Sequence, residues 1–413
     1  MRPVEEQRAR VLDAAVKPRP VRVAISEAQG LLCAEEVVTK SPLPGFDQAA
    51  IDGYAVRSID VQPAKDSPEA VVTLPVVGEV SAGSRQPTRL QPRQAVRVET
   101  GAPLPTLADA VLPLKWTDGN AARLTVRDPV RSGDFVRHVG DDVQPGDVAV
   151  RSGTVIGAAQ VGLLAAVGKN KVLVHPRPRL SVISVGGELV DIDRSPGSGQ
   201  VYDVNSYALA AAARDAGAAV TRVGIAPNDP RKLRDVVEGQ LIRSEIVVIS
   251  GAVGGSASEQ VREVLADLGE VSVDRVAMHP GSVQGFGRLG GERVPTFLLP
   301  ANPVSALVVF EVMVRPLVRV TLGKRNPLRR VVTARTVSPV TSIKGRRGFL
   351  RGQLMRDEAT GDYLVQALGG APGSSSHLLA TLAEANCLVL VDPEVTEVRT
   401  GDEVQVAFLA QRA

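Results

Sequence analysis

The sequence predicts a multidomain protein that combines α+β and α/β parts, and three observations lead to this fold class. First, 413 residues are too many for one hydrophobic core, so we expect two to four domains. Second, short β-prone runs broken by glycine and proline fill residues 21–150. Third, strand-like and helix-like segments alternate through residues 180–315, which is typical of a parallel sheet covered by helices on both faces.

The first part of the chain predicts one helix and then a β-rich module. Residues 5–16 place apolar side chains on one helical face, and Pro18 prevents the helix from continuing. A second apolar helix is expected over residues 154–167, before Gly168. Between the two helices we expect short strands, the clearest at 70–80, 94–98 and 122–130.

The character of the sequence changes near residue 175, where a Pro-rich linker precedes the α/β segment. Asp229 and Pro230 mark one helix start, because Asp caps free N–H groups and proline fits the first helical turn. After a polar linker at 324–328, residues 329–413 return to β-prone runs and predict a small barrel or sandwich. The expected strands of the α/β segment are 180–185, 220–225, 245–250 and 296–299, and its other helices are 206–216, 258–268 and 303–315.

Composition excludes several classes of function. A net charge of +3 and an aromatic content of 3% argue against nucleic acid as a partner. Cys33 and Cys387 lack metal-ligand spacing and are expected to be buried, and four scattered histidines make a zinc site improbable. No apolar run is long enough to span a membrane, and the N-terminus has no signal-peptide core, so we expect a cytoplasmic protein.

The most informative motif covers residues 41–56. Prolines and glycines prevent it from forming one regular element, and Asp52 is followed by Gly53. We expect Gly53 to permit a tight bend that directs Asp52 into a cleft. The alternative is an ordinary surface turn in which the aspartate caps backbone N–H groups.

Three loops rich in small residues form the second candidate site. They follow predicted strands at 184–188, 250–256 and 299–305, so all three should meet at the carboxyl edge of the sheet, where open α/β folds bind ligands. Glycines allow backbone N–H groups to approach a ligand, and helix N-termini favour anions. A phosphorylated or otherwise anionic small molecule is expected there. The alternative is that these are ordinary glycines of strand-to-helix turns.

These motifs together resemble the MoeA/gephyrin family, the molybdopterin molybdenumtransferases. The resemblance runs from about residue 5 to 410 and rests on segments 41–56, 99–105, 108–110, 140–142, 145–147, 199–206, 349–352 and 375–377, besides the three loops. It implies insertion of molybdenum from molybdate into adenylylated molybdopterin, with Mg²⁺. It also implies an elongated homodimer with four subdomains: 1–26 plus 140–174 (I), 27–139 (II), 175–325 (III, α/β, binding molybdopterin) and 326–413 (IV, a β-barrel).

The resemblance also assigns roles to individual residues. Asp52, Thr100, Asp142 and Glu188 match positions implicated in catalysis, and the carboxylates of Asp52 and Glu188 would hold Mg²⁺. Arg351 would offer a planar fork of donors to an oxyanion. The expected ligand-binding residues are Ser184, Gly186, Ser250, Gly251, Pro300, Asn302, Pro303, Ser305, Arg351 and Ser376, of which Ser305, Arg351 and Ser376 match molybdate contacts.

Departures from the family pattern open alternatives to catalysis. Ala257 stands where the family has an aspartate, while His279 and Ser282 replace two anion-binding lysines. His279 would restore one charge only if it were protonated. One alternative is therefore a gephyrin-like dimeric scaffold that binds a short peptide of a tubulin-like division filament or of a membrane receptor near subdomains III and IV. A third is a sensor that binds molybdopterin without turnover.

Overall fold

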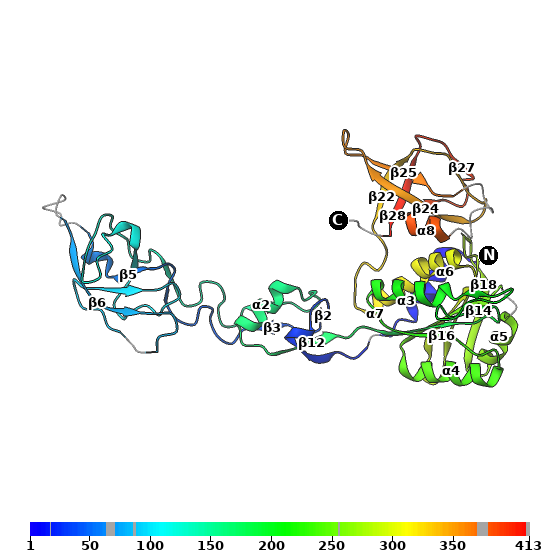
Figure 1. The fold of residues 1–413 in the computed structure, drawn as a ribbon, viewed down its shortest axis with the longest axis horizontal. Coiled ribbons are helices and arrows are strands. Elements are labelled where there is room, and N and C mark those ends of the chain that lie inside the picture. The colour runs from blue at the N-terminus through cyan, green and yellow to red at the C-terminus, as the bar shows by residue number, and fades with distance from the viewer. Residues whose placement is uncertain (17, 63–70, 86–87, 255–256, 370–378, 410–413) are drawn as a thin grey trace. The chain divides into compact units, whose positions relative to one another are not determined.

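The computed structural model describes the chain except for residues 17, 63–70, 86–87, 255–256, 370–378 and 410–413 (Figure 1). It contains two compact units. The first joins Met1–Val21 to His175–Ala413, and the second is Arg22–Val174. No helix in the described part of the chain is both long and apolar enough to cross a membrane.

The α/β domain of the first unit is built on a six-stranded sheet. Four strands are parallel, as the sequence predicts, while two further strands extend the sheet in antiparallel fashion. The antiparallel pair escapes sequence analysis because glycines interrupt its apolar pattern. A Cβ at Gly287 would collide with the Glu270 carbonyl of the neighbouring strand. The strand order is β16 (Ala219–Ile225), β13 (Arg179–Ser184), β17 (Ile246–Val253), β21 (Val294–Pro300), β20 (Val283–Leu289) and β18 (Gly269–Arg275).

Helices cover both faces of this sheet and make three layers (Figure 1). Successive residues of β13 show the alternation, because Val182 packs into one core and Ile183 into the other. One face carries α1 (Val4–Asp13), α3 (Val204–Ala216) and the continuous run of α6 (Pro303–Val309), η4 (Phe310–Val314) and α7 (Arg315–Thr321). The other face carries α4 (Pro230–Arg243) and α5 (Ser258–Ala266).

Helix α1 packs away from the rest of the N-terminal segment. Val4 and Val11 are buried in the same core as α3 and α7, and Met1–Val21 belongs to the first compact unit. The apolar face of α1 completes a core that forms from distant segments, and helical periodicity does not reveal which core a helix joins.

The C-terminal region of the first unit is a closed β-barrel, which confirms the predicted barrel. Five strands pair around the ring, and the last pairs back to the first, which leaves no open edge. Cys387 is fully buried inside it. In ring order the strands are β24 (Arg347–Arg356), β25 (Tyr363–Ala367), β22 (Val331–Thr336), β28 (Glu403–Phe408) and β26 (Cys387–Val391). Also present are β19 (Met278–His279), which pairs with β24, β23 (Val340–Thr341), β27 (Glu397–Val398) and α8 (Leu379–Glu384).

The second unit contains a β-rich module and a smaller module. The main sheet has the order β8 (Ala110–Pro113), β5 (Gly53–Val56), β7 (Ala95–Val98), β6 (Thr73–Val80) and β9 (Arg123–Thr125), with β4 (Gln48–Ala49) and β10 (Val136–Arg137) as a separate pair. The smaller module holds β1 (Val21–Ala24), β2 (Leu32–Cys33), β12 (Lys171–His175), β3 (Val37–Val38), β11 (Val148–Val150) and α2 (Ala158–Ala166). Single turns are η1 (Ile25–Glu27), η2 (Ser58–Asp60) and η3 (Leu114–Trp116).

Strand pairings join the two parts of the smaller module. β2 pairs with β12, and β3 pairs with β11, so residues 32–38 are hydrogen-bonded to strands near the end of the second unit. Cys33 is buried in the core of this module, as expected for a small apolar side chain.

Candidate functional site

A cavity of about 210 Å³ opens at the carboxyl edge of the α/β sheet, where the sequence places the three loops. All three loops contribute to it, together with the segment that leads into α3. We call it the sheet-edge cavity. Its lining residues are Val185, Glu188, Leu189, Val201, Tyr202, Asp203, Val204, Asn205, Ser250, Gly251, Ala301 and Pro303.

Gly251 lies in the last part of β17, where the register of its pairing with β21 shifts. Its φ is +81°, which disfavours any residue with a side chain. A Cβ at this position would also collide with the Val185 carbonyl oxygen of the neighbouring loop. The backbones are held together here, because Val185 N donates to the Ser250 carbonyl oxygen at 2.9 Å. Glycine is therefore required for two loops to meet at the cavity.

Two buried serines at the strand ends hold the start of α3. Ser184 Oγ donates to Asp203 Oδ1 at 2.8 Å, and the same oxygen caps α3 by accepting from Ser206 N at 3.0 Å. Ser250 Oγ accepts from Asn205 Nδ2 at 2.7 Å. Ser184 and Ser250, which were predicted as site residues, thus hold the start of α3 beside the cavity. They do so through Asp203 and Asn205, which were not predicted.

Glu188 and Asp203 reach the cavity through a short pair of strands, β14 (Leu189–Val190) and β15 (Val201–Tyr202). Glu188 precedes β14 and Asp203 follows β15, and the two strands run parallel. The Glu188 carboxylate folds back over Gly186, where an added Cβ would meet it at 2.9 Å. Glu188 is exposed, whereas Asp203 is 1% exposed.

The third loop leads into α6. Asn302 is the N-cap of this helix, and its Oδ1 accepts from Ser305 N at 3.0 Å, while Pro303 occupies the first turn. Pro300 ends β21 beside them. The segment in which His279 and Ser282 replace the two lysines of the family lies against the same helix. A Cβ at Gly281, within this segment, would lie 3.4 Å from the Ser305 carbonyl oxygen.

The residues that replace the two family lysines supply no positive charge. Burial, together with the nearby Arg346, lowers the pKa of His279 below its usual 6.5, so the imidazole is neutral near pH 7. Ser282 Oγ donates to the Val276 carbonyl oxygen at 3.0 Å. Ala257, at the start of α5, provides no side-chain cap.

Two predicted anion contacts belong to the barrel region. Arg351 lies on β24 and is only 6% exposed, so an anion would have to reach a largely buried guanidinium. Ser376 lies outside the described residues. Arg351 is not among the described residues that line the sheet-edge cavity.

The lining of the sheet-edge cavity carries negative rather than positive charge. Glu188 and Asp203 contribute carboxylates, and the described lining includes no lysine or arginine. The cavity alone is therefore unfavourable for phosphate or molybdate, whose charge needs cations or several N–H donors. Any anionic group of a ligand must be held outside this lining.

The second unit brings Asp52 and Thr100 together. Asp52 Oδ1 accepts from both the N and the Oγ1 of Thr100, each at 2.7 Å. These bonds, the hydroxyl first, lower the pKa of the Asp52 carboxyl below its usual range, so it is ionised at neutral pH. Gly53 plays a different part from the one predicted. Its φ is not positive, and it is required because a Cβ would strike the Leu112 carbonyl of β8.

Asp142 is exposed, and its backbone N donates to the Leu43 carbonyl oxygen at 3.0 Å. This bond ties the segment around Asp142 to the start of the early motif. The other aspartate of that motif, Asp47, accepts from Val139 N at 2.8 Å. Asp47 therefore has a structural role in joining the same two segments.

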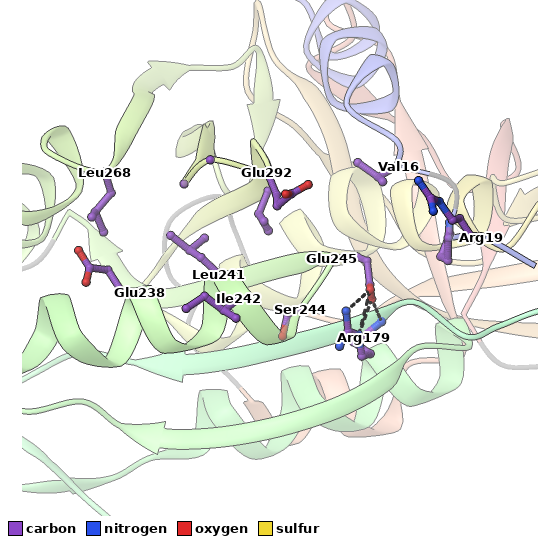
Figure 2. Close-up of a pocket in the computed structure, with 14 residues that line it drawn as sticks. Val16, Arg19, Arg179, Glu238, Leu241, Ile242, Ser244, Glu245, Leu268 and Glu292 are labelled. Carbon is purple, nitrogen blue, oxygen red and sulfur yellow. Dashed lines mark hydrogen bonds and ion pairs between the residues drawn. The ribbon is translucent and has the colours of Figure 1, made fainter. Parts of the chain in front are cut away.

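A larger cavity of about 890 Å³ lies at the opposite, amino-terminal edge of the α/β sheet and was not predicted (Figure 2). It is lined by the end of α4, the turn after β20 and the ion pair between Arg179 and Glu245 (Figure 2). Arg179 also donates its backbone N to that carboxylate at 2.6 Å. These interactions hold the first residue of β13 against β17.

Sequence reasoning missed Asp203 and Asn205 as cavity residues. The available signal was an Asp-x-Asn immediately before an alanine-rich helix, and it indicated a helix cap. Within the described part of the chain, no cluster of three or more His, Cys, Asp and Glu side chains is arranged to hold a metal ion.

Fold and cavity define a multidomain protein with a ligand-binding α/β domain and a C-terminal barrel. Three family models match in order: the MoeA N-terminal region (domain I and II) at residues 2–168, the probable molybdopterin binding domain at 181–320, and the MoeA C-terminal region (domain IV) at 333–409. The chain belongs to the MoeA family.

Relatives match over the whole chain. It is 70% identical to molybdopterin molybdenumtransferase 1 of Mycobacterium tuberculosis, with 100% of both chains covered. It is 38% identical to molybdopterin molybdenumtransferase 2 of the same organism, over 98% of this chain and 99% of the relative. The crystal structure of the molybdopterin biosynthesis MoeA protein of Pyrococcus horikoshii is similar, with a TM-score of 0.81, 31% identity and 99% of each chain covered.

Proposed function

We propose that this protein is a molybdopterin molybdenumtransferase, which inserts molybdenum from molybdate into adenylylated molybdopterin. One observation carries the proposal: the sheet-edge cavity lies in the domain that matches the molybdopterin-binding family model, within a chain 70% identical to a named molybdenumtransferase. We place the activity in the cytoplasm and in a homodimer, as the family resemblance implies.

The sheet-edge cavity holds the uncharged part of molybdopterin in this proposal, because its lining offers hydrogen-bond acceptors and apolar contacts. Ser250, Gly251 and the exposed Glu188 all line it. Glu188 in the first unit and Asp52 in the second are each an oxygen donor of the kind that suits Mg²⁺, which needs few protein carboxylates when substrate phosphates supply other ligands. Mg²⁺, when bound, would neutralise charge on those phosphates.

The ionised Asp52 is the best candidate for a catalytic carboxylate in the second unit. Two hydrogen bonds from Thr100 fix its position and keep it charged. Asp142 and Arg351 remain proposed contributors from the resemblance. The neutral His279 and Ser282 predict weaker anion binding than in family members with two lysines, because each charge-assisted contact is worth about 1.5–3 kcal/mol.

Complementation tests this function in cells. The gene is expressed in a bacterial strain that lacks its own molybdenum insertase, and the activity of a molybdenum-dependent enzyme is measured. We expect restored activity with the wild-type chain and loss with Asp52→Ala. Absence of rescue by a well-expressed wild-type chain, also at raised molybdate, contradicts the proposal.

A second candidate function is a peptide-binding scaffold, and one observation favours it. Two small apolar cavities, of about 160 and 170 Å³, lie where the α/β domain meets the barrel. Leu388 of the barrel lines both, and Arg8 and Arg347 border the first. Such a surface suits a short apolar peptide. Titration with candidate tail peptides of division and membrane proteins tests it, and a Leu388→Asp variant should abolish binding.

A further inference from the structure

Two buried acceptors of the sheet-edge cavity lack donors. Asp203 Oδ2 and Asn205 Oδ1 are both buried, and neither has a hydrogen-bond partner. Their residues are 1% and 9% exposed and both line the cavity. Buried polar atoms in folded proteins nearly always have a protein or water partner, so two orphan acceptors in one cavity indicate that a bound molecule supplies the donors.

The neighbouring hydrogen bonds fix which atoms are left over. Asn205 Nδ2 donates to the Ala301 carbonyl oxygen at 2.8 Å and to Ser250 Oγ at 2.7 Å. Because a carbonyl can only accept, the amide cannot be reversed, and its oxygen must be the free acceptor. In Asp203 both donors, Ser184 Oγ and Ser206 N, reach Oδ1, which leaves Oδ2 without a partner.

No cation neutralises the Asp203 carboxylate within the described residues. The guanidinium of Arg222 approaches this region, but it stacks on Tyr207 at 4.0 Å and donates to Asp191 and to Ser206 Oγ. A buried carboxylate with only neutral donors attracts further donors and repels anions. The cavity is therefore suited to an N–H-rich edge of a neutral ring.

We propose that Asp203 and Asn205 recognise the amino group and adjacent ring N–H of a pterin, and so determine which end of the substrate enters the sheet-edge cavity. This inference rests on the proposed function, whose substrate carries a pterin ring. The acceptor-lined cavity takes the ring, and the negative charge of its lining directs the phosphate groups outward.

Fluorescence titration with two small heterocycles tests this recognition. Pterin has the donor amino group, while lumazine has a carbonyl in its place and otherwise nearly the same shape. We expect wild-type protein to bind pterin at least about tenfold more tightly, because lumazine turns a charge-assisted hydrogen bond into a contact between acceptors. Equal affinities in the wild-type protein overturn the inference without the need for any variant.

Asp203→Asn is the diagnostic variant. The amide oxygen can keep the helix cap and the Ser184 bond, while its NH₂ replaces the orphan acceptor by a donor. We expect the pterin preference to fall to near unity or to reverse toward lumazine, a change that simple destabilisation does not produce. Asp229→Asn is the matched control: Asp229 caps α4 by accepting from Lys232 N at 3.0 Å but does not line the cavity, so it should keep the preference.

Two further comparisons separate the inference from its competitors. The titrations are repeated with EDTA and with Mg²⁺; a preference that appears only with Mg²⁺ overturns the inference, because the acceptors would then be metal ligands. Wild-type protein that supports complementation but does not distinguish the two rings refutes this inference alone. A clear pterin preference in protein that does not support complementation refutes the proposed function alone.

Discussion

Replacing Gly251 by alanine tests how the sheet-edge cavity is built, and Gly254→Ala in the same loop is its matched control. Both glycines have positive φ, +81° and +73°. A Cβ at Gly251 would collide with the Val185 carbonyl oxygen, whereas a Cβ at Gly254 would meet no atom of the described residues within 4 Å. The two variants therefore share the conformational cost and differ in the collision.

The magnitudes follow from these two terms. Left-handed backbone costs a residue with a side chain about 1–2 kcal/mol, which is the loss of unfolding free energy expected for Gly254→Ala. Relieving the collision at Gly251 means moving Val185, whose N–H bond to Ser250 is worth about 0.5–1.5 kcal/mol. We therefore expect Gly251→Ala to cost about 1.5–3.5 kcal/mol in total and to weaken pterin binding, which Gly254→Ala should preserve.

Guanidinium unfolding of the full chain measures both variants with two probes. Far-UV circular dichroism reports mainly the first unit, which holds all the described α-helices except α2. Fluorescence of Trp116, the one tryptophan, reports the second unit and should not change. We claim that glycine is required at 251 by the close contact between the two loops as well as by its backbone conformation. Equal losses of unfolding free energy in the two variants would refute this claim.

Three other predictions concern single side chains. Asn302→Ala should cost about 1 kcal/mol of unfolding free energy in denaturant titrations by removing the α6 cap, and no loss would show that the cap is redundant. The pKa of His279 is lower in the folded state, so as pH falls below about 6.5 the unfolded chain takes up the proton before the folded chain does. The free energy of unfolding of the wild type should therefore fall more than that of His279→Gln between about pH 7 and 5. Parallel plots of unfolding free energy against pH for the two proteins would contradict this. Asp52→Asn should lower the turnover of molybdenum insertion about 10²-fold with little change in melting temperature. The control is Asp118→Asn, which removes another exposed carboxylate held by backbone N–H groups and should leave turnover intact. Equal effects of the two substitutions on turnover would argue against a catalytic Asp52.

The sequence predicts what local patterns determine. Alternating strands and helices, with glycines after strand ends, were enough to place the three loops at one sheet edge, and Asp229 correctly marked the start of α4. The antiparallel strands β18 and β20 could not be predicted, because Gly287 and its neighbours interrupt the apolar alternation for the sake of close strand packing.

Prediction of the site was less complete, because burial and partner geometry depend on distant segments. Asp203 lies in the segment 199–206, which carried the family resemblance, but only the structure shows that it caps α3 and that one of its oxygens remains unpaired. The loops were expected to accept an anion, yet the carboxylates of Glu188 and Asp203 make the cavity itself negative. The protonation of His279 likewise depended on its burial beside Arg346, which lies far along the chain.

The central claim is that this chain transfers molybdenum, and a reaction with purified components tests it most directly. Wild-type protein is mixed with adenylylated molybdopterin, molybdate and Mg²⁺, and AMP release and molybdenum cofactor are measured together. We predict that both products form in equal amounts and that both require molybdate. Tight binding of adenylylated molybdopterin with neither product, over a range of molybdate concentrations, would contradict the account and leave a protein that binds this molecule without converting it.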